Sequence, residues 1–263
     1  MQFSRRDTLR FGLAGSATAL AATGGLGGTI FMPFAARAES ARDSYKTTNG
    51  EIAISPISHA SFVMSVPGLV IYADPVGGKA LYDGYEPAGL VLITHEHGDH
   101  FDPETLAAIV TDDTRLLVNP AVLEKLPAGL KERATSIGNG ESHTLDAIAI
   151  EAIPAYNLTE DRLKYHPKGR DSGYVLTVDG SRVYIAGDTE DIPEMRALEN
   201  IDIAFVPMNL PYTMDIDQAS SAVAEFRPGV VYPYHYSESD PLAFAEKVAQ
   251  AAPDVKVVQG KWY

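Results

Sequence analysis

The chain has no cysteine among its 263 residues. Disulfide bonds, thiolate metal ligands and a cysteine nucleophile are therefore excluded. Basic residues are also scarce, because 21 lysines and arginines stand against 35 aspartates and glutamates, for a net charge of −14. A surface of this sign repels phosphate backbones, so we expect no nucleic-acid partner. Because 45% of the residues are hydrophobic, we expect a folded domain with a sizeable core.

The first forty residues have the pattern of an export signal. Paired arginines, Arg5 and Arg6, precede an uncharged stretch from 11 to 36 that is rich in alanine, glycine and threonine. Small residues at Ala36 and Ala38 then offer a cleavage site. This pattern resembles a twin-arginine signal peptide, so we expect residues 1–38 to be removed and the protein to act in the periplasm. The stretch is long enough to span a membrane, but its repeated glycines argue against a stable anchor.

The remaining chain, residues 39–263, alternates between predicted strands and helices. Short apolar runs bounded by turn residues predict strands over 51–57, 61–66, 69–73, 90–94, 115–118, 147–153, 174–178, 182–186, 201–207, 230–234 and 255–258. Helices are expected over 103–110, 217–226 and 241–251. This order suggests one domain with two sheets and helices outside them.

The segment 95–100, His-Glu-His-Gly-Asp-His, directly follows a predicted buried strand. On an extended segment, side chains two residues apart share a face, so His95 and His97 can bind one metal ion. The glycine permits a tight bend that directs Asp99 and His100 toward a second position. Imidazoles and a carboxylate suit Zn²⁺, and Mn²⁺ or Fe²⁺ would also fit.

This segment resembles the metallo-β-lactamase superfamily, and in particular a lactonase-like branch related to ascorbate-6-phosphate lactonase. Further segments match that branch in the same order: 58–62, 71–75, 154–157, 166–169, 184–189, 207–214 and 232–236. The resemblance implies an α+β fold, an αββα sandwich of two mixed sheets with outer helices and the metals at one edge. It also implies a metal-dependent hydrolase.

The resemblance further implies ligands for two divalent metal ions: His95 and His97 at the first, Asp99, His100 and His235 at the second, and Asp188 as a bridge. The third histidine that the family usually has at the first ion is replaced here by Asn157, a poor ligand for Zn²⁺. His166 could fold back to take that place, or both residues could contact the substrate. If neither binds the metal, we expect one ion only.

Several other residues are candidates for the chemistry. The family places His59 at the cavity floor, where it could hydrogen-bond a metal ligand, protonate a leaving group or remain a core histidine. Asp99 could accept a proton from the nucleophile. Asn209 and Tyr212 are expected to contact the substrate, where they could donate hydrogen bonds to an oxyanion. Asp74 is expected to orient the 95–100 segment. We place His143 in a polar surface turn.

These assignments predict that a hydroxide activated by two metal ions attacks an ester or lactone of a small molecule. Two alternatives stay open. One is a phosphodiesterase of the same fold, since fold does not fix the substrate, and Lys168 and Arg170 could meet an anion. The other is a non-catalytic periplasmic protein that binds metal or ligand, which Asn157 favours. The sequence does not indicate the oligomeric state.

Overall fold

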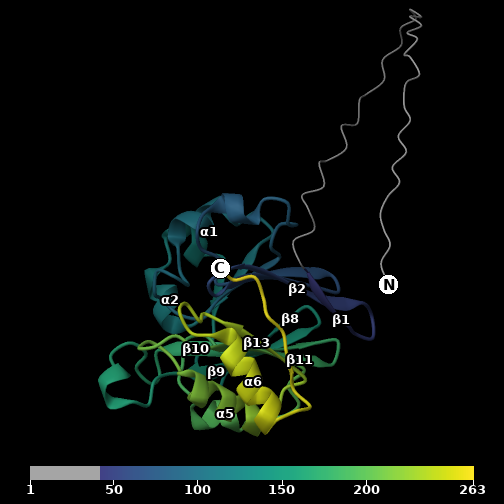
Figure 1. Ribbon diagram of the computed structural model, residues 1–263. Coiled ribbons are helices and arrows are strands. Elements are labelled where there is room, and N and C mark those ends of the chain that lie inside the picture. Colours follow the sequence, from purple (N-terminus) through teal and green to yellow (C-terminus); the bar gives the residue numbers. More distant parts are fainter. Residues whose placement is uncertain (1–41) are drawn as a thin grey trace, which may run out of the picture. The chain divides into compact units, whose positions relative to one another are not determined.

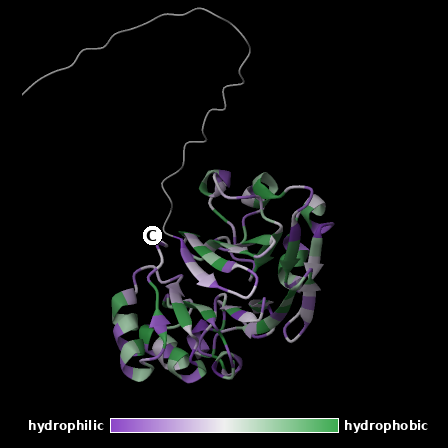
Figure 2. Cartoon of the chain, turned by 90° about the vertical axis from the view of Figure 1, so that its right-hand side faces the viewer, coloured by the Kyte–Doolittle hydropathy of each residue, from purple (hydrophilic) through white to green (hydrophobic). Residues whose placement is uncertain are grey.

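The computed structural model describes residues 42–263, and the expected signal peptide, residues 1–38, lies outside the described residues. The described residues form two seven-stranded sheets that pack face to face, with helices on the outer face of each (Figure 1). In Figure 2 the strands and the helices both carry hydrophobic (green) and hydrophilic (purple) stretches. The predicted αββα sandwich is confirmed. No helix within residues 42–263 has the length and apolar character needed to cross a membrane.

The first sheet has the strand order β1 to β7. Its strands run antiparallel from β1 to β4 and parallel from β4 to β7. The elements of this half are β1 (Asp43–Lys46), β2 (Glu51–Ser58), β3 (Ser61–Val66), β4 (Leu69–Ala73), η1 (Lys79–Tyr82), β5 (Leu90–Ile93), α1 (Pro103–Ile109), β6 (Arg115–Val118), α2 (Pro120–Lys125), α3 (Ala128–Lys131) and β7 (Ala134–Ser136).

The second sheet has the order β14 to β8. It is antiparallel from β8 to β11 and parallel from β11 to β14, so both sheets are mixed. Its half comprises β8 (Ser142–Leu145), β9 (Ile148–Ala155), η2 (Glu160–Arg162), β10 (Asp171–Val178), β11 (Ser181–Ile185), α4 (Pro193–Arg196), β12 (Ile203–Pro207), α5 (Ile216–Phe226), β13 (Val230–Tyr234), α6 (Pro241–Ala251) and β14 (Lys256–Val257).

Three hydrophobic clusters hold the four layers together. The central cluster joins the two sheets, and in it the rings of Phe62 and Phe205 stack with their centroids 4.2 Å apart. Leu106 of α1 packs in a second cluster outside the first sheet, and Val223 of α5 in a third outside the second sheet. Burial of apolar surface in these three clusters supplies the main driving force for the fold.

The strands and helices expected from longer apolar runs are present. The short elements β1, β7, β8 and α2 to α4 were not predicted, because segments of three to six residues carry too little periodicity. The placement of His143 in a surface turn is wrong. This half-buried residue lies in β8, which pairs with β9 through a tight connection at Asp146, whose φ is +52°.

The carboxyl ends of parallel strands meet at one edge of each sheet, and this arrangement positions the site. Strand β5 runs parallel to β4, and β11, β12 and β13 run parallel to one another. Two hydrogen bonds join the sheets near the end of β5, from the Tyr174 hydroxyl to the Ile93 carbonyl (2.9 Å) and from the Ser172 N–H to the Thr94 carbonyl (3.1 Å). Loops that follow strands of both sheets therefore converge.

Candidate metal centre

The 95–100 segment begins directly at the end of the buried strand β5. The carboxylate of Asp74, at the end of β4, accepts hydrogen bonds from the Thr94 N–H (2.8 Å) and the Thr94 hydroxyl (2.7 Å). The same carboxylate lies 2.8 Å from Nδ1 of His100. Asp74 thus orients the start and the end of the segment, as a carboxylate behind metal-binding histidines commonly does.

His95, His97 and His166 form one donor set, whose nitrogen atoms lie within 4.8 Å of one another. His166 comes from the long loop between β9 and β10 and is buried. Its Nδ1 lies 2.9 Å from Oδ2 of Asp171, and that carboxylate in turn accepts hydrogen bonds from the Arg170 guanidinium at 2.7 and 2.8 Å. Because Nδ1 of His166 contacts Asp171, the other ring nitrogen, Nε2, faces the cluster.

Asn157 ties two loops together. Its Nδ2 donates to the carbonyl oxygens of Arg162 (3.1 Å) and Tyr212 (2.8 Å), and its backbone N–H donates to the His166 carbonyl (2.8 Å). Its buried Oδ1 has no hydrogen-bond partner in the part of the chain that the structure describes. The amide nitrogen of Asn157 is thus hydrogen-bonded to loop carbonyls. The residue that the structure brings beside His95 is His166.

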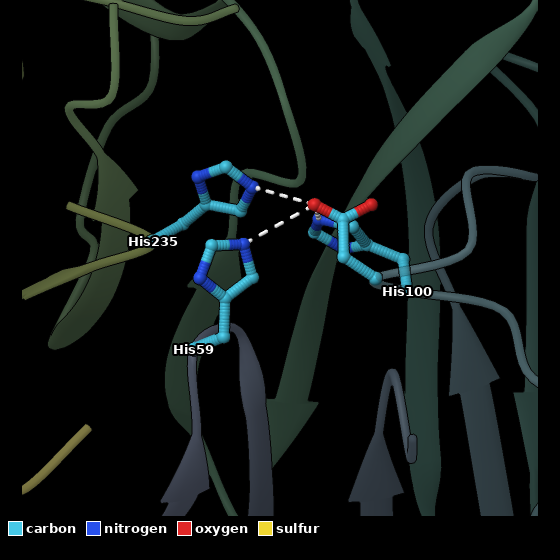
Figure 3. Close-up of side chains that lie close together, drawn as sticks. His59, His100 and His235 are labelled. Carbon is cyan, nitrogen blue, oxygen red and sulfur yellow. Dashed lines mark hydrogen bonds and ion pairs between the residues drawn. The ribbon is translucent and has the colours of Figure 1, made fainter. Parts of the chain in front are cut away.

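A second donor set comprises His59, Asp99, His100 and His235. Figure 3 shows the rings of His59 and His235 directed at one carboxylate oxygen. That oxygen is Oδ2 of Asp99, 3.2 Å from Nε2 of His59 and 3.4 Å from Nε2 of His235. His59 follows β2, and its backbone carbonyl accepts a hydrogen bond from the His235 N–H (3.0 Å). His59 thus lies against the second donor set.

Asp188 lies between the two donor sets. Its Oδ1 is 3.3 Å from Nε2 of His100, and its Oδ2 is 3.4 Å from Nε2 of His166 and 3.2 Å from that of His235. Burial raises the pKa of the Asp188 carboxyl, but the histidines around it, His235 first, hold that pKa well below its usual range. The preceding Gly187 has φ of +64°, and a Cβ there would lie 3.1 Å from Cβ of Thr94. Glycine therefore permits the close approach of the Asp188 loop to the histidine segment.

Several buried nitrogen and oxygen atoms that face this cluster have no hydrogen-bond partner within residues 42–263: Nε2 of His95, Nε2 of His100, both ring nitrogens of His235 and Oδ1 of Asp188. Unpaired polar atoms of this kind are costly in a protein interior. Burial also lowers the pKa of His95 well below its usual value, which favours the neutral, ligating form of the ring. The donor set fits a divalent first-row metal ion.

Glu190 fixes the loop that carries His166. Its fully buried carboxylate accepts hydrogen bonds from the backbone N–H groups of Leu158 (2.6 Å) and Thr159 (2.7 Å). It also accepts from the Thr159 hydroxyl and the Arg162 guanidinium, both at 2.7 Å. Sequence reasoning missed this role, because a glutamate in a loop has no distinctive pattern.

The C-terminal segment contacts His59, and this too was missed. The Tyr263 hydroxyl lies 2.7 Å from Nδ1 of His59, and the Trp262 carbonyl accepts a hydrogen bond from the His59 N–H (3.0 Å). Trp262 is buried in the central cluster. The only tryptophan of the chain thereby anchors the segment that reaches the site.

Two cations near the cluster are already paired. The Arg170 guanidinium contacts Asp171 and the Tyr165 carbonyl (2.7 Å), and it lies 3.3 Å from Nε2 of His97. Lys168 donates to the Tyr156 hydroxyl at 3.0 Å and to Glu194 at 3.3 Å.

Asn209 and Tyr212 lie outside the histidine cluster, on the loop that follows β12. Both residues line a neighbouring cavity of about 750 Å³, which Ser237 borders from the loop after β13. The Tyr212 carbonyl accepts the hydrogen bond from Asn157, and its ring packs on that of Tyr165 with centroids 4.9 Å apart. The cavity and the cluster thus share structural elements.

Comparison with known proteins is consistent with this geometry. Residues 53–235 match the family model of the β-lactamase superfamily domain. The UPF0173 metal-dependent hydrolase of Thermococcus onnurineus is 34% identical over 59% of this chain and 70% of that protein. A crystal structure of a proposed metal-dependent hydrolase from Parabacteroides distasonis has 41% identity and a TM-score of 0.76, covering 85% of this chain and 99% of that one. Igni18, a metallo hydrolase from Ignicoccus hospitalis, has 27% identity and a TM-score of 0.67, covering 80% and 95% respectively. The chain therefore belongs to the β-lactamase superfamily, as a metal-dependent hydrolase.

Proposed function

We propose that the protein is an exported hydrolase with two divalent metal ions, zinc by preference, that cleaves ester or lactone bonds in small molecules. In this proposal residues 1–38 are the signal peptide and the enzyme acts in the periplasm. The observation that carries the proposal is the position of Asp188, whose two oxygens face donors from both histidine sets. A carboxylate in that position is suited to bridge two ions.

The proposed ligands are His95, His97 and His166 at the first ion, Asp99, His100 and His235 at the second, and Asp188 at both. Bound divalent ions would lower the pKa of a coordinated water toward neutrality and polarise the carbonyl oxygen of the substrate. Imidazole nitrogens and carboxylate oxygens suit Zn²⁺, while Mn²⁺ and Fe²⁺ are the alternatives.

Four residues of the chain would assist the chemistry. The Asp99 side chain is 49% exposed, so it can accept a proton from the nucleophile at the open side of the cluster. His59 makes its 3.2 Å contact with Asp99 through Nε2 and can donate from that atom to a leaving group. Tyr212, exposed beside the cavity, can donate a hydrogen bond from its hydroxyl to a developing oxyanion, and Asn209 can hold the substrate.

The state of the nearby cations supports ester or lactone hydrolysis over phosphodiester hydrolysis. Apart from the metal ions, free basic side chains would favour an anionic substrate, but Arg170 and Lys168 both have carboxylate partners. The cavity beside Tyr212 is bordered by Asp215, Asp217 and Glu238. A neutral ester avoids repulsion from these carboxylates.

Elemental analysis of the zinc-reconstituted protein tests the metal assignment. We expect two equivalents in the wild type and about one in His166→Ala, because the first ion would lose one of its three histidines. Asn157→Ala and His143→Ala, a histidine outside the cluster, should both keep two equivalents. Two equivalents in His166→Ala would remove His166 from the ligands, and a loss in Asn157→Ala would point to Asn157 instead.

Hydrolysis assays test the reaction. The zinc protein should cleave p-nitrophenyl esters and simple lactones faster than bis(p-nitrophenyl) phosphate, and Asp99→Ala should abolish cleavage. Faster cleavage of the phosphodiester would favour the phosphodiesterase alternative. Two bound metal ions without turnover of any of these compounds would favour a non-catalytic metal-binding protein.

A further inference from the structure

Exposed large apolar side chains gather on the loop that carries His166, on the loop after β12 that packs against it, and on the C-terminal segment that contacts His59. Within residues 42–263 there are six such side chains: Leu158, Leu163, Leu210, Tyr212, Leu242 and Tyr263. The first two belong to the loop that carries His166, the next two to the loop after β12, and the last to the segment that contacts His59. Scattered exposed apolar residues are normal, but a grouping at a functional site indicates a binding surface.

These segments are joined to one another around the site. The rings of Tyr165 and Tyr212 pack with centroids 4.9 Å apart, which joins the His166 loop to the loop after β12. The Tyr263 hydroxyl accepts a hydrogen bond from the Ser237 N–H (2.8 Å), which joins the C-terminal segment to the loop after β13. Ser237 and Tyr212 both line the cavity of about 750 Å³. We call this space the rim cavity.

The rim cavity combines apolar walls with negative charge. Leu210, Pro211, Tyr212 and Ile216 supply its apolar lining. Three carboxylates border it against a single ammonium group, that of Lys247, which lies 2.7 Å from Asp217. An anionic group placed here would meet net repulsion, whereas an uncharged apolar group would leave water for a partly apolar surface.

We propose that the rim cavity binds the non-reacting part of the substrate, an uncharged alkyl or aryl group of several carbons, and rejects anionic groups. This inference rests on the proposed ester or lactone hydrolysis and names its substrate class. The cavity volume lies within the range of small-molecule sites, in which apolar walls supply affinity and a few polar groups fix orientation.

A lipid surface is the competing occupant, and the charge distribution argues against it. Membrane-docking surfaces carry lysine and arginine beside their apolar residues, because phospholipid surfaces are commonly anionic. The border of the rim cavity is acidic, and the whole chain has a net charge of −14. The structure therefore favours a small neutral molecule over a membrane.

Ester hydrolysis by the full zinc-loaded chain tests the inference. From p-nitrophenyl acetate to the octanoate, kcat/KM should rise about tenfold or more, because each added methylene gains apolar contact. The p-nitrophenyl pentanoate should be cleaved about tenfold faster than mono-p-nitrophenyl glutarate. The glutarate has the same number of acyl carbons but ends in a carboxylate, which the acidic border would repel. Leu210→Ser should flatten the chain-length series, and Leu242→Ser, which alters an exposed leucine outside the cavity lining, should leave it unchanged. A flat series in the wild type, or preference for the glutarate, would overturn the inference.

Binding of N-phenyl-1-naphthylamine, a neutral apolar fluorescent probe, gives a test that does not depend on turnover. The wild type and Leu242→Ser should bind the probe, and Leu210→Ser should bind it about tenfold more weakly. If no ester is cleaved but the probe binds in this pattern, the proposed function fails and the cavity assignment stands. Equal binding by all three proteins, or Leu210-dependent binding to phosphatidylcholine vesicles without binding of the probe, would overturn the assignment.

Discussion

The hydroxyl of Tyr263 contacts Nδ1 of His59 at 2.7 Å, while the other ring nitrogen, Nε2, contacts Asp99. Burial raises the pKa of Asp99, but the neighbouring rings of His235 and His59 hold that pKa well below its usual value, so Asp99 is a carboxylate and can only accept. The 3.2 Å bond to Asp99 therefore places a proton on Nε2 of His59. In a neutral ring Nδ1 then accepts, so the Tyr263 hydroxyl donates to it while accepting from Ser237.

Removing that hydroxyl should weaken the preference for this tautomer, because Nδ1 of His59 loses the donor from which it accepts. In Tyr263→Phe we expect kcat to fall about fivefold to tenfold, the equivalent of one hydrogen bond of about 1 kcal/mol, with KM and metal content unchanged. Long-range ¹H–¹⁵N spectra of the zinc protein should show the His59 ring shifting toward a mixture of tautomers. Tyr236→Phe is the control, because its ring packs on Tyr263 at 4.8 Å but its hydroxyl does not contact His59. An unchanged tautomer in Tyr263→Phe would refute this role.

The contrast between His100 and Tyr263 shows what the sequence could predict. The 95–100 segment was identified because its candidate ligands lie within six residues, and a strand followed by a bend dictates their directions. Tyr263 lies 204 residues from His59 along the chain, so only the folded structure brings them together. The roles of Glu190 and Asp171 could not be predicted for the same reason, because they depend on loops whose paths no local sequence pattern specifies. The order of apolar runs predicted two sheets with outer helices, and the family resemblance implied the αββα sandwich, whereas the short elements could not be predicted.

Asp74→Asn should weaken metal binding without a change in any proposed ligand. The Asp74 carboxylate accepts a hydrogen bond from Nδ1 of His100, which keeps the proton of the neutral ring on Nδ1. The unprotonated Nε2 then faces the cluster. An asparagine that keeps its bond to the Thr94 N–H would present its NH₂ group to Nδ1, which favours the tautomer with Nε2 protonated. We expect zinc affinity to fall about tenfold to a hundredfold, measured by competition with a chelator.

Asp102→Asn is the matched control for Asp74→Asn. Asp102 caps α1 by accepting from the Glu104 N–H at 3.0 Å, and asparagine caps helices about as well as aspartate. This variant should therefore keep the zinc affinity of the wild type. If Asp74→Asn also keeps it, the carboxylate does not set the His100 tautomer.

Glu190→Gln tests whether a buried carboxylate holds the His166 loop in place. The side-chain NH₂ group of glutamine would face hydrogen-bond donors, where the Glu190 carboxylate now accepts from them. The substitution would also leave the Arg162 guanidinium, only 18% exposed, without its charged partner. Breaking a buried ion pair on one side typically costs about 3 kcal/mol, which should lower the midpoint of urea unfolding. Because the loop carries His166, the first zinc equivalent should also bind more weakly while the second is retained. Glu194→Gln is the control, since its partner Lys168 is 66% exposed and such surface pairs contribute about 1 kcal/mol or less. Equal effects of the two substitutions on stability and on zinc binding would show that the Glu190 contacts do not position His166.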